Sequence, residues 1–188
     1  MNAEISRKDN LFYRSLLAFV FILIAAGLRI APHPWNFAPI GAMALFSGAL
    51  VRDRRLAFLF PLVTLFAGDL FLGFHKLMPV IYASFLLSVL IGRWLQNRRT
   101  LARVTGATVL GAAQFFMVTN FGVWAVGNLY PRNLAGLMAC YVAGVPFFWN
   151  TLAGDAFYVG ILFGSFALAE RSFPALREPA LARGRVKP

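Results

Sequence analysis

Charged residues are scarce in this chain, and acidic residues are the scarcest. Only 7 of the 188 residues are Asp or Glu, against 18 Lys or Arg, and charged residues make up 13% of the total. A soluble domain carries about 25% charged residues. No charged residue occurs in 30–51, 104–131 or 133–154. The scarcity excludes an ordinary soluble domain and predicts an integral membrane protein, because about 20 apolar residues cross a bilayer as one helix.

Other absences narrow the function. The single cysteine, Cys140, excludes an internal disulfide framework. The sequence contains no phosphate-binding loop, hydrolase nucleophile elbow, zinc motif or kinase signature, so we expect neither enzymatic activity nor a cofactor. The net charge of +11 lies in short clusters between apolar runs, which argues against nucleic acid as a partner.

The apolar runs predict an all-α membrane protein with six transmembrane helices in one domain, 1–170, since the alternation of a membrane barrel is absent. Residues 134–145 predict a short outer helix or re-entrant piece, broken from the last span at Gly144 and Pro146. The stretch 171–188 predicts a disordered basic cytoplasmic tail. The expected spans are about 12–30, 36–51, 56–74, 78–96, 103–127 and 146–169.

Basic residues set the expected orientation, because cytoplasmic loops are enriched in Lys and Arg. The side of the two termini receives the basic clusters at 7–14, 52–55, 93–103 and 171–187, whereas the other receives only Arg29, Lys76 and Arg132. Both termini are therefore expected in the cytoplasm. The first 30 residues also resemble a signal peptide, but no clear small-x-small cleavage site follows, which favours an uncleaved first span.

Two intramembrane aspartates share a motif. Ala-Gly-Asp-x-Phe occurs at 67–71 and again at 153–157, three spans apart and so in helices of opposite direction. This arrangement is typical of an inverted 3+3 repeat around a shared cavity. A carboxylate at this depth is a functional candidate. The structural alternative is that Gly-Asp allows tight helix packing, with the carboxylate satisfied by a neighbouring polar group.

Polar and aromatic residues gather in the outer half of the predicted bundle. Aromatic walls with a few convergent polar groups are typical of a small-molecule site. Each residue has a structural alternative: an aromatic belt at the membrane interface, an interhelical hydrogen bond or a solvated loop. His33, His75 and Cys140 are weak metal candidates without a tight ligand spacing. The expected substrate-binding residues are Trp35, Asn36, Asp69, His75, Asn120, Trp124, Tyr130, Asn150 and Asp155.

Several short motifs resemble a family of small bacterial integral membrane proteins: PWNFAPI at 34–40, ALFSG at 44–48, GDLFLGFHK at 68–76, YP at 130–131, CY at 140–141 and NTLAGD at 150–155. This family is similar to the substrate-binding S components of energy-coupling-factor vitamin transporters, including the cobalamin-transporting BtuM group. The resemblance implies six helices, a vitamin pocket near the outer face, residence in the bacterial inner membrane and a coupling protein with ATPases. The Ala-x-x-x-Ala surface common in the first helix of S components is absent; its nearest equivalent is Ala38 and Ala42.

The leading functional hypothesis is a membrane-embedded binding and uptake protein for a vitamin-like small organic molecule. A structural or assembly protein without a ligand is the first alternative. An intramembrane enzyme is the second, and it requires an acid-base pair at one reactive spot.

Overall fold

The computed structural model describes residues 2–28, 34–173 and 176, with side chains described from Asn10 onward. The prediction of an all-helical chain is confirmed, since these residues form helices and no strand. His33 and most of the tail expected at 171–188 lie outside the described residues. The helices are α1 (Asn2–Leu28), α2 (Ile40–Leu50), α3 (Arg54–Leu72), α4 (Met78–Trp94), α5 (Leu101–Val126) and α6 (Leu134–Ser172).

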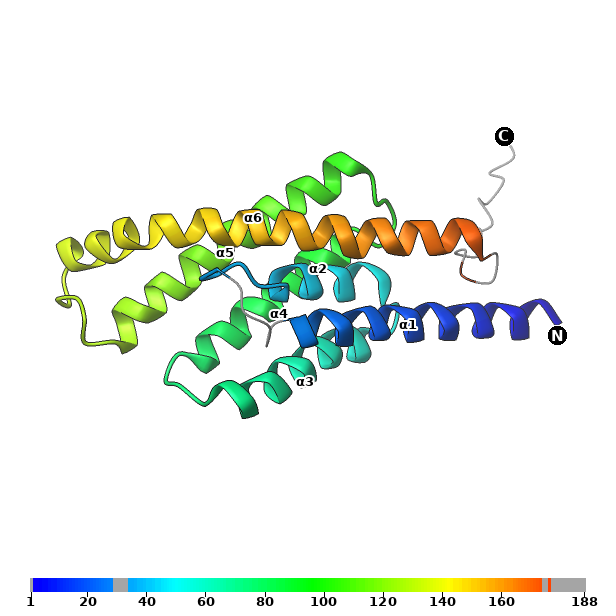
Figure 1. Cartoon of the computed structure of the whole chain (residues 1–188), viewed down its shortest axis with the longest axis horizontal. Coiled ribbons are helices and arrows are strands. Elements are labelled where there is room, and N and C mark those ends of the chain that lie inside the picture. The colour runs from blue at the N-terminus through cyan, green and yellow to red at the C-terminus, as the bar shows by residue number, and fades with distance from the viewer. Residues whose placement is uncertain (1, 29–33, 174–175, 177–188) are drawn as a thin grey trace, which may run out of the picture.

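Successive helices run in opposite directions, and α2 lies in the middle of the bundle (Figure 1). The start of α1 and the end of α6 lie at the same end of the molecule, together with the α2–α3 and α4–α5 connections. We call this the arginine-rich end, because Arg54 begins α3, Arg99 lies in the α4–α5 connection and Arg171 lies in the last turn of α6. The turn between α5 and α6 projects at the far end.

Four helices, α1, α3, α5 and α6, are long and apolar enough to cross a membrane. Large apolar side chains cover their outer faces: Phe66 is 51% exposed, Phe121 50% and Phe157 54%. Such a surface fits hydrocarbon better than water. The expected span at 36–51 is wrong in one respect, because the helix begins only at Ile40, after Pro39. Its 11 residues extend about 16 Å, well short of a 30 Å hydrocarbon core.

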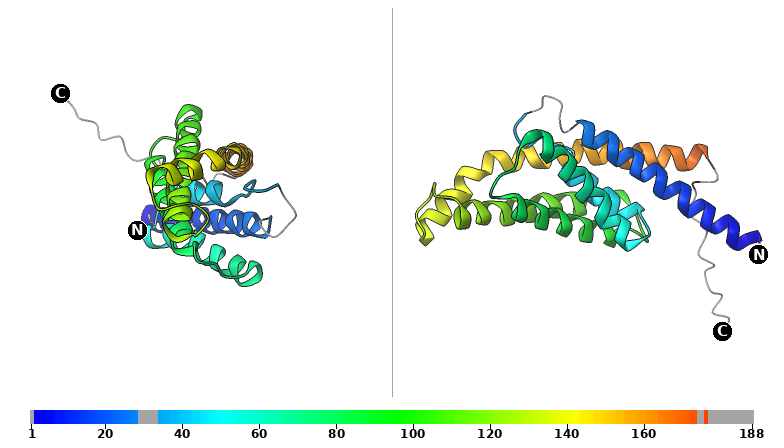
Figure 2. Two further views of the ribbon diagram at one scale, coloured as in Figure 1. Left: turned by 90° about the vertical axis from the view of Figure 1, so that its left-hand side faces the viewer. Right: turned by 90° about the horizontal axis from the view of Figure 1, so that it is seen from below.

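The predicted break at Gly144 and Pro146 is also wrong, because α6 continues through both residues over 39 residues. A continuous helix keeps nearly all backbone groups paired, which matters where water is excluded. Pro146 removes one backbone donor, and α6 bends in its N-terminal part (Figure 2). Gly144 instead permits close packing, since a Cβ there would lie 2.4 Å from Oδ1 of Asn120 on α5.

The core forms around α2, in which Ala42 to Leu50 are all buried and which contacts the five other helices. Glycines bring α2 and α4 close together. A Cβ on Gly48 would lie 2.1 Å from the Val89 carbonyl oxygen, and one on Gly92 would lie 2.2 Å from that of Leu45. Small residues at such crossings let helix backbones meet.

Candidate functional site

A cavity of about 90 Å³ lies where the segment 34–39 and the start of α2 meet α4, α5 and α6. Two of the nine predicted site residues, Asn36 and Asp155, line it. Thr151 and Ser88, which are not among the nine predicted residues, add hydroxyl groups. The complete lining is Asn36, Ala38, Ile40, Gly41, Phe85, Ser88, Gly111, Phe115, Thr151 and Asp155.

Asp155 is buried, with 3% of its surface exposed, and its carboxyl group lies at the N-terminus of α2. Its oxygens lie directly against Gly41, in the first turn of α2. Pro39, the N-cap residue of α2, makes no side-chain capping bond. A carboxylate is stabilised at a helix N-terminus by the unpaired N–H groups and the helix dipole. Asp155, on α6, therefore places its carboxyl group at the N-terminus of a different helix, α2.

Two glycines make this approach possible. A Cβ on Gly41 would lie 2.3 Å from Asp155 Oδ1, and one on Gly154 would lie 3.0 Å from the Cα of Phe37. Any larger side chain would push α6 away from α2 or displace the carboxyl group. The glycine in the second Ala-Gly-Asp motif thus serves close packing, as the structural alternative expected, while its aspartate lines a cavity.

A hydrogen-bonded network adjoins the cavity on α4 and α5. The Gln114 side-chain amide donates to Ser88 Oγ at 2.8 Å and to the Ser84 carbonyl oxygen at 3.0 Å. Ser84 Oγ in turn donates to Gln114 Oε1 at 3.1 Å. On the α6 wall, Thr151 Oγ1 donates to the Phe147 carbonyl oxygen at 2.9 Å, which leaves its lone pairs to accept from a ligand. Carboxylate and hydroxyl oxygens in an aromatic wall favour a ligand that donates hydrogen bonds or carries positive charge.

The segment 34–39 is held on α6 above the cavity. Asn150 on α6 donates from Nδ2 to the Trp35 carbonyl oxygen at 3.0 Å. Phe37 N–H donates to the Pro34 carbonyl oxygen at 2.9 Å, and Asn36 takes a left-handed backbone conformation with φ of 61°. Asparagine tolerates this conformation better than most residues. The Trp35 ring, by contrast, is 82% exposed and does not line the cavity.

Asp69 does not line this cavity, so the structure does not bring the two carboxylates together there. Asp69 is 3% exposed and accepts a 2.7 Å hydrogen bond from the Tyr82 hydroxyl on α4. The positions of the two aspartates along their helices explain why only Asp155 reaches the cavity. Asp69 lies in the last turn of α3, whereas Asp155 lies far from either end of the 39-residue α6.

The remaining predicted residues also have other surroundings. Trp124 Nε1 donates to the Pro131 carbonyl oxygen at 2.9 Å, and Arg132 lies over the Trp124 ring, so both close the α5–α6 turn. The Asn120 side chain donates to the Phe116 carbonyl oxygen at 2.8 Å, and the Asn120 backbone carbonyl accepts from Cys140 Sγ.

The last two predicted residues lie in different loops. His75 is exposed, and Tyr130 is half-buried. No group of three His, Cys, Asp or Glu among the described residues could hold a metal ion.

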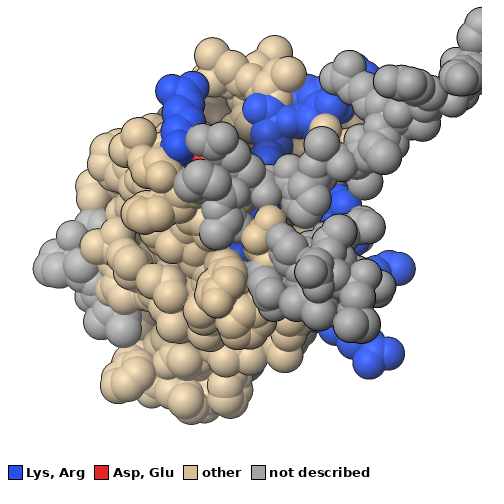
Figure 3. All heavy atoms as spheres, turned by 90° about the vertical axis from the view of Figure 1, so that its right-hand side faces the viewer, with Lys and Arg blue, Asp and Glu red and all other residues tan. Residues whose placement is uncertain are grey.

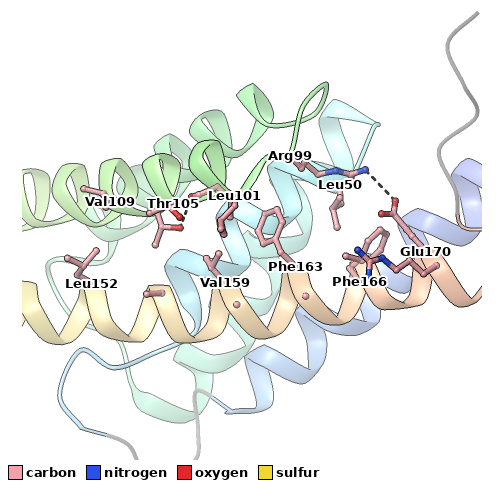
Figure 4. A pocket seen from close by; sticks show the side chains of 17 residues that line it. Leu50, Arg99, Leu101, Thr105, Val109, Leu152, Val159, Phe163, Phe166 and Glu170 are labelled. Atoms are coloured by element: carbon pink, nitrogen blue, oxygen red, sulfur yellow. Dashed lines mark hydrogen bonds and ion pairs between the residues drawn. The ribbon is translucent and has the colours of Figure 1, made fainter.

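A second, larger cavity of about 850 Å³ lies between α5 and α6 and reaches the arginine-rich end (Figure 4). Arg99, Glu170 and Arg171 line that end of it. The polar groups predicted from the sequence were expected in the opposite half of the bundle. The sequence feature that could have indicated this second cavity is Glu170, an acidic residue at the end of a long apolar tract among basic residues.

Residues 9–176 match a protein-family model described as a family of unknown function, DUF6580. The chain belongs to this family. Comparison with curated proteins and with solved structures gives no match. The family assignment adds no activity, so function has to be argued from the geometry.

Proposed function

We propose that this DUF6580 protein is a membrane-embedded binding protein that takes up a small organic molecule through the cavity lined by Asp155. The main support is the position of a buried carboxyl group on a cavity wall, beside hydroxyl groups of Thr151 and Ser88. An ionisable group this deep in an apolar bundle costs free energy, and such groups usually mark a site of binding or transport. The ligand class that this wall favours carries N–H or O–H donors or a positive charge.

The proposed arrangement in the membrane has six passes, with the arginine-rich end in the cytoplasm of a bacterium. The alternating helix directions and the basic connections at one end support this arrangement. In this proposal α2 and the non-helical segment 34–39 together form the second pass, because irregular backbone is tolerated inside a membrane where protein buries it. The opposite directions of α3 and α6 support an inverted repeat, although α6 has 39 residues and α3 only 19.

The cavity volume constrains the ligand. Pockets for drug-sized molecules have volumes of about 300–1,000 Å³, whereas this cavity has about 90 Å³. A vitamin-sized molecule therefore requires the cavity to widen. In this proposal the segment 34–39 separates from α6, which breaks the hydrogen bond from Asn150 to Trp35. We also propose coupling to a transmembrane protein with ATPases, and the only support for it is the motif resemblance.

A ligand screen tests the proposal. Purified protein in detergent is heated with single vitamins, their precursors and small organic cations, and unfolding is followed by intrinsic fluorescence. A ligand at 100 times its Kd should stabilise the folded protein by about 2.7 kcal/mol. Stabilisation by one chemically related group of compounds supports the proposal, and no stabilisation across the screen counts against it.

A structural or assembly role without a ligand is the second candidate. Asp69 favours it, because Tyr82 satisfies this carboxyl group within the bundle. An intramembrane enzyme would need two acid-base groups at one spot, and the cavity contains Asp155 without Asp69. We therefore do not propose catalysis.

A further inference from the structure

The groove between α5 and α6 is distinct from the Asp155 cavity and about nine times larger, with a volume of about 850 Å³ against about 90 Å³. One wall is the N-terminal half of α5, and the other is the C-terminal half of α6 (Figure 4). Its lining is Leu50, Arg99, Leu101, Val104, Thr105, Thr108, Val109, Leu152, Ala156, Val159, Gly160, Phe163, Gly164, Phe166, Ala167, Glu170 and Arg171.

The α6 wall has open space in front of it. A Cβ built on Gly160 or Gly164 meets no other atom within 4 Å, in contrast to the tightly packed glycines at 41, 48, 92 and 154. On the α5 wall, Leu101 is 84% exposed and Val109 46% exposed. Most of the groove lining is therefore apolar with room beside it, and nonpolar groups such as acyl chains fit there.

The groove changes character along its length. The part near Val109 and Leu152 carries no charge and is mostly apolar, with the hydroxyl groups of Thr105 and Thr108, whereas Arg99, Glu170 and Arg171 lie at the arginine-rich end. Glu170 Oε1 lies 2.5 Å from Arg14 and 3.4 Å from Arg99, so one carboxylate faces more than one arginine. Lys and Arg side chains also dominate the charged surface at this end (Figure 3). Among the described residues that line the groove at this end, two arginines accompany one glutamate, a formal net charge of +1.

We propose that this groove binds an anionic phospholipid, with the phosphate at Arg99 and Arg171 and the acyl chains along α5 and α6. Basic pockets between transmembrane helices on the cytoplasmic side are suited to anionic headgroups. Arginine also pairs with phosphate through two parallel N–H bonds. An amphiphile with one anionic end matches the groove along its length, whereas an apolar partner helix would leave the charged end unmatched.

The test is native mass spectrometry of the full chain with equal amounts of phosphatidylglycerol and phosphatidylcholine that carry the same acyl chains. We expect the wild type to retain phosphatidylglycerol preferentially. The double variant Arg99→Gln/Arg171→Gln should lose roughly tenfold in affinity for it, since each basic group near the headgroup contributes to binding. The matched control is Arg54→Gln/Arg55→Gln, which removes the same charge from exposed residues outside the groove lining and should retain the wild-type preference.

Gly164→Leu provides an independent test that leaves every ion pair in place. The added side chain enters open space at residue 164 and should fill the groove without disturbing the fold. We expect it to reduce retained phosphatidylglycerol while the unfolding temperature stays unchanged. Equal retention of the two lipids by the wild type, or unchanged retention by Gly164→Leu, would overturn the proposal. A dimer peak that the wild type shows and Gly164→Leu lacks would also overturn it, because the groove would then hold a second copy of the chain.

Discussion

Gly41 and Asp155 are in such close contact that a single methyl group on residue 41 would lie 2.3 Å from the Asp155 carboxylate. The contact joins the start of the buried central helix α2 to the middle of the longest helix, α6. It also fixes one wall of the proposed binding cavity, because both residues line that cavity. The same pair of residues therefore takes part both in the packing of α2 on α6 and in the proposed binding cavity.

Gly41→Ala should destabilise the protein and displace the carboxyl group from α2. Overpacking of this kind costs about 1–3 kcal/mol. The measurement is the thermal unfolding midpoint in detergent. Gly106→Ala is the matched control, since a Cβ there meets nothing within 4 Å and alanine favours the helix. Equal midpoints for Gly41→Ala and the wild type would show that the contact is not as tight as described.

Gly92→Ala should be more disruptive than Gly41→Ala. Its Cβ would lie 2.2 Å from the Leu45 carbonyl oxygen, which is backbone and cannot rotate away as a carboxyl group can. We expect α2 and α4 to separate, with a loss at or beyond the upper end of the roughly 1–3 kcal/mol range for overpacked cores. Yield of folded protein and the unfolding midpoint measure the effect. A Gly92→Ala variant more stable than Gly41→Ala would contradict the predicted order.

Most of the helices could be predicted from the sequence because each apolar run is long and several begin just after a typical N-cap residue. Asp53, Thr100 and Asn133 each accept a hydrogen bond from the first turn of the following helix. These residues are typical N-caps, and they mark the starts of α3, α5 and α6. Proline was a weaker guide: Pro39 precedes α2, whereas Pro146 lies inside α6.

Arg14→Gln should destabilise the protein far more than Arg99→Gln, although both arginines pair with Glu170. Arg14 is 3% exposed and lies 2.5 Å from Glu170, whereas Arg99 is 21% exposed and lies 3.4 Å away. Removal of one partner from a buried pair costs about 3–5 kcal/mol, because the other charge stays buried. Because Glu170 is partly exposed, we expect the loss for Arg14→Gln to fall below that range. The more exposed pair of Arg99 with Glu170 should contribute only about 0–1 kcal/mol. Equal losses of unfolding free energy in the two variants would contradict this ranking.

Tyr82→Phe should lower stability modestly and leave ligand binding intact. The change removes the 2.7 Å hydrogen bond to Asp69, and loss of a bond to a buried polar group costs about 1–3 kcal/mol. Asp69 lies outside the lining of the Asp155 cavity, so the ligand-induced stabilisation should match that of the wild type. A Tyr82→Phe protein that folds normally but binds no ligand would place the site near Asp69 instead.

The candidate site could be predicted only in part. Burial of both aspartates follows from the apolar tracts around them, but helix rotation and helix length decide which neighbour each carboxyl group meets. Asp69 meets Tyr82, and Asp155 meets the start of α2. The sequence likewise cannot show that Asn150 bonds to the Trp35 backbone, because these residues are 115 positions apart.

The most direct measurement compares ligand-induced stabilisation of the wild type, Asp155→Asn and Asp69→Asn against the same panel of vitamins, precursors and organic cations. Both substitutions change one carboxyl group in the same five-residue motif, and Asp69 and Asp155 are each 3% exposed, so the variants are matched in chemistry and burial. We predict that a compound stabilising the wild type also stabilises Asp69→Asn and fails to stabilise Asp155→Asn. Retained stabilisation in a folded Asp155→Asn protein, or its loss in Asp69→Asn alone, would contradict the proposed role of Asp155.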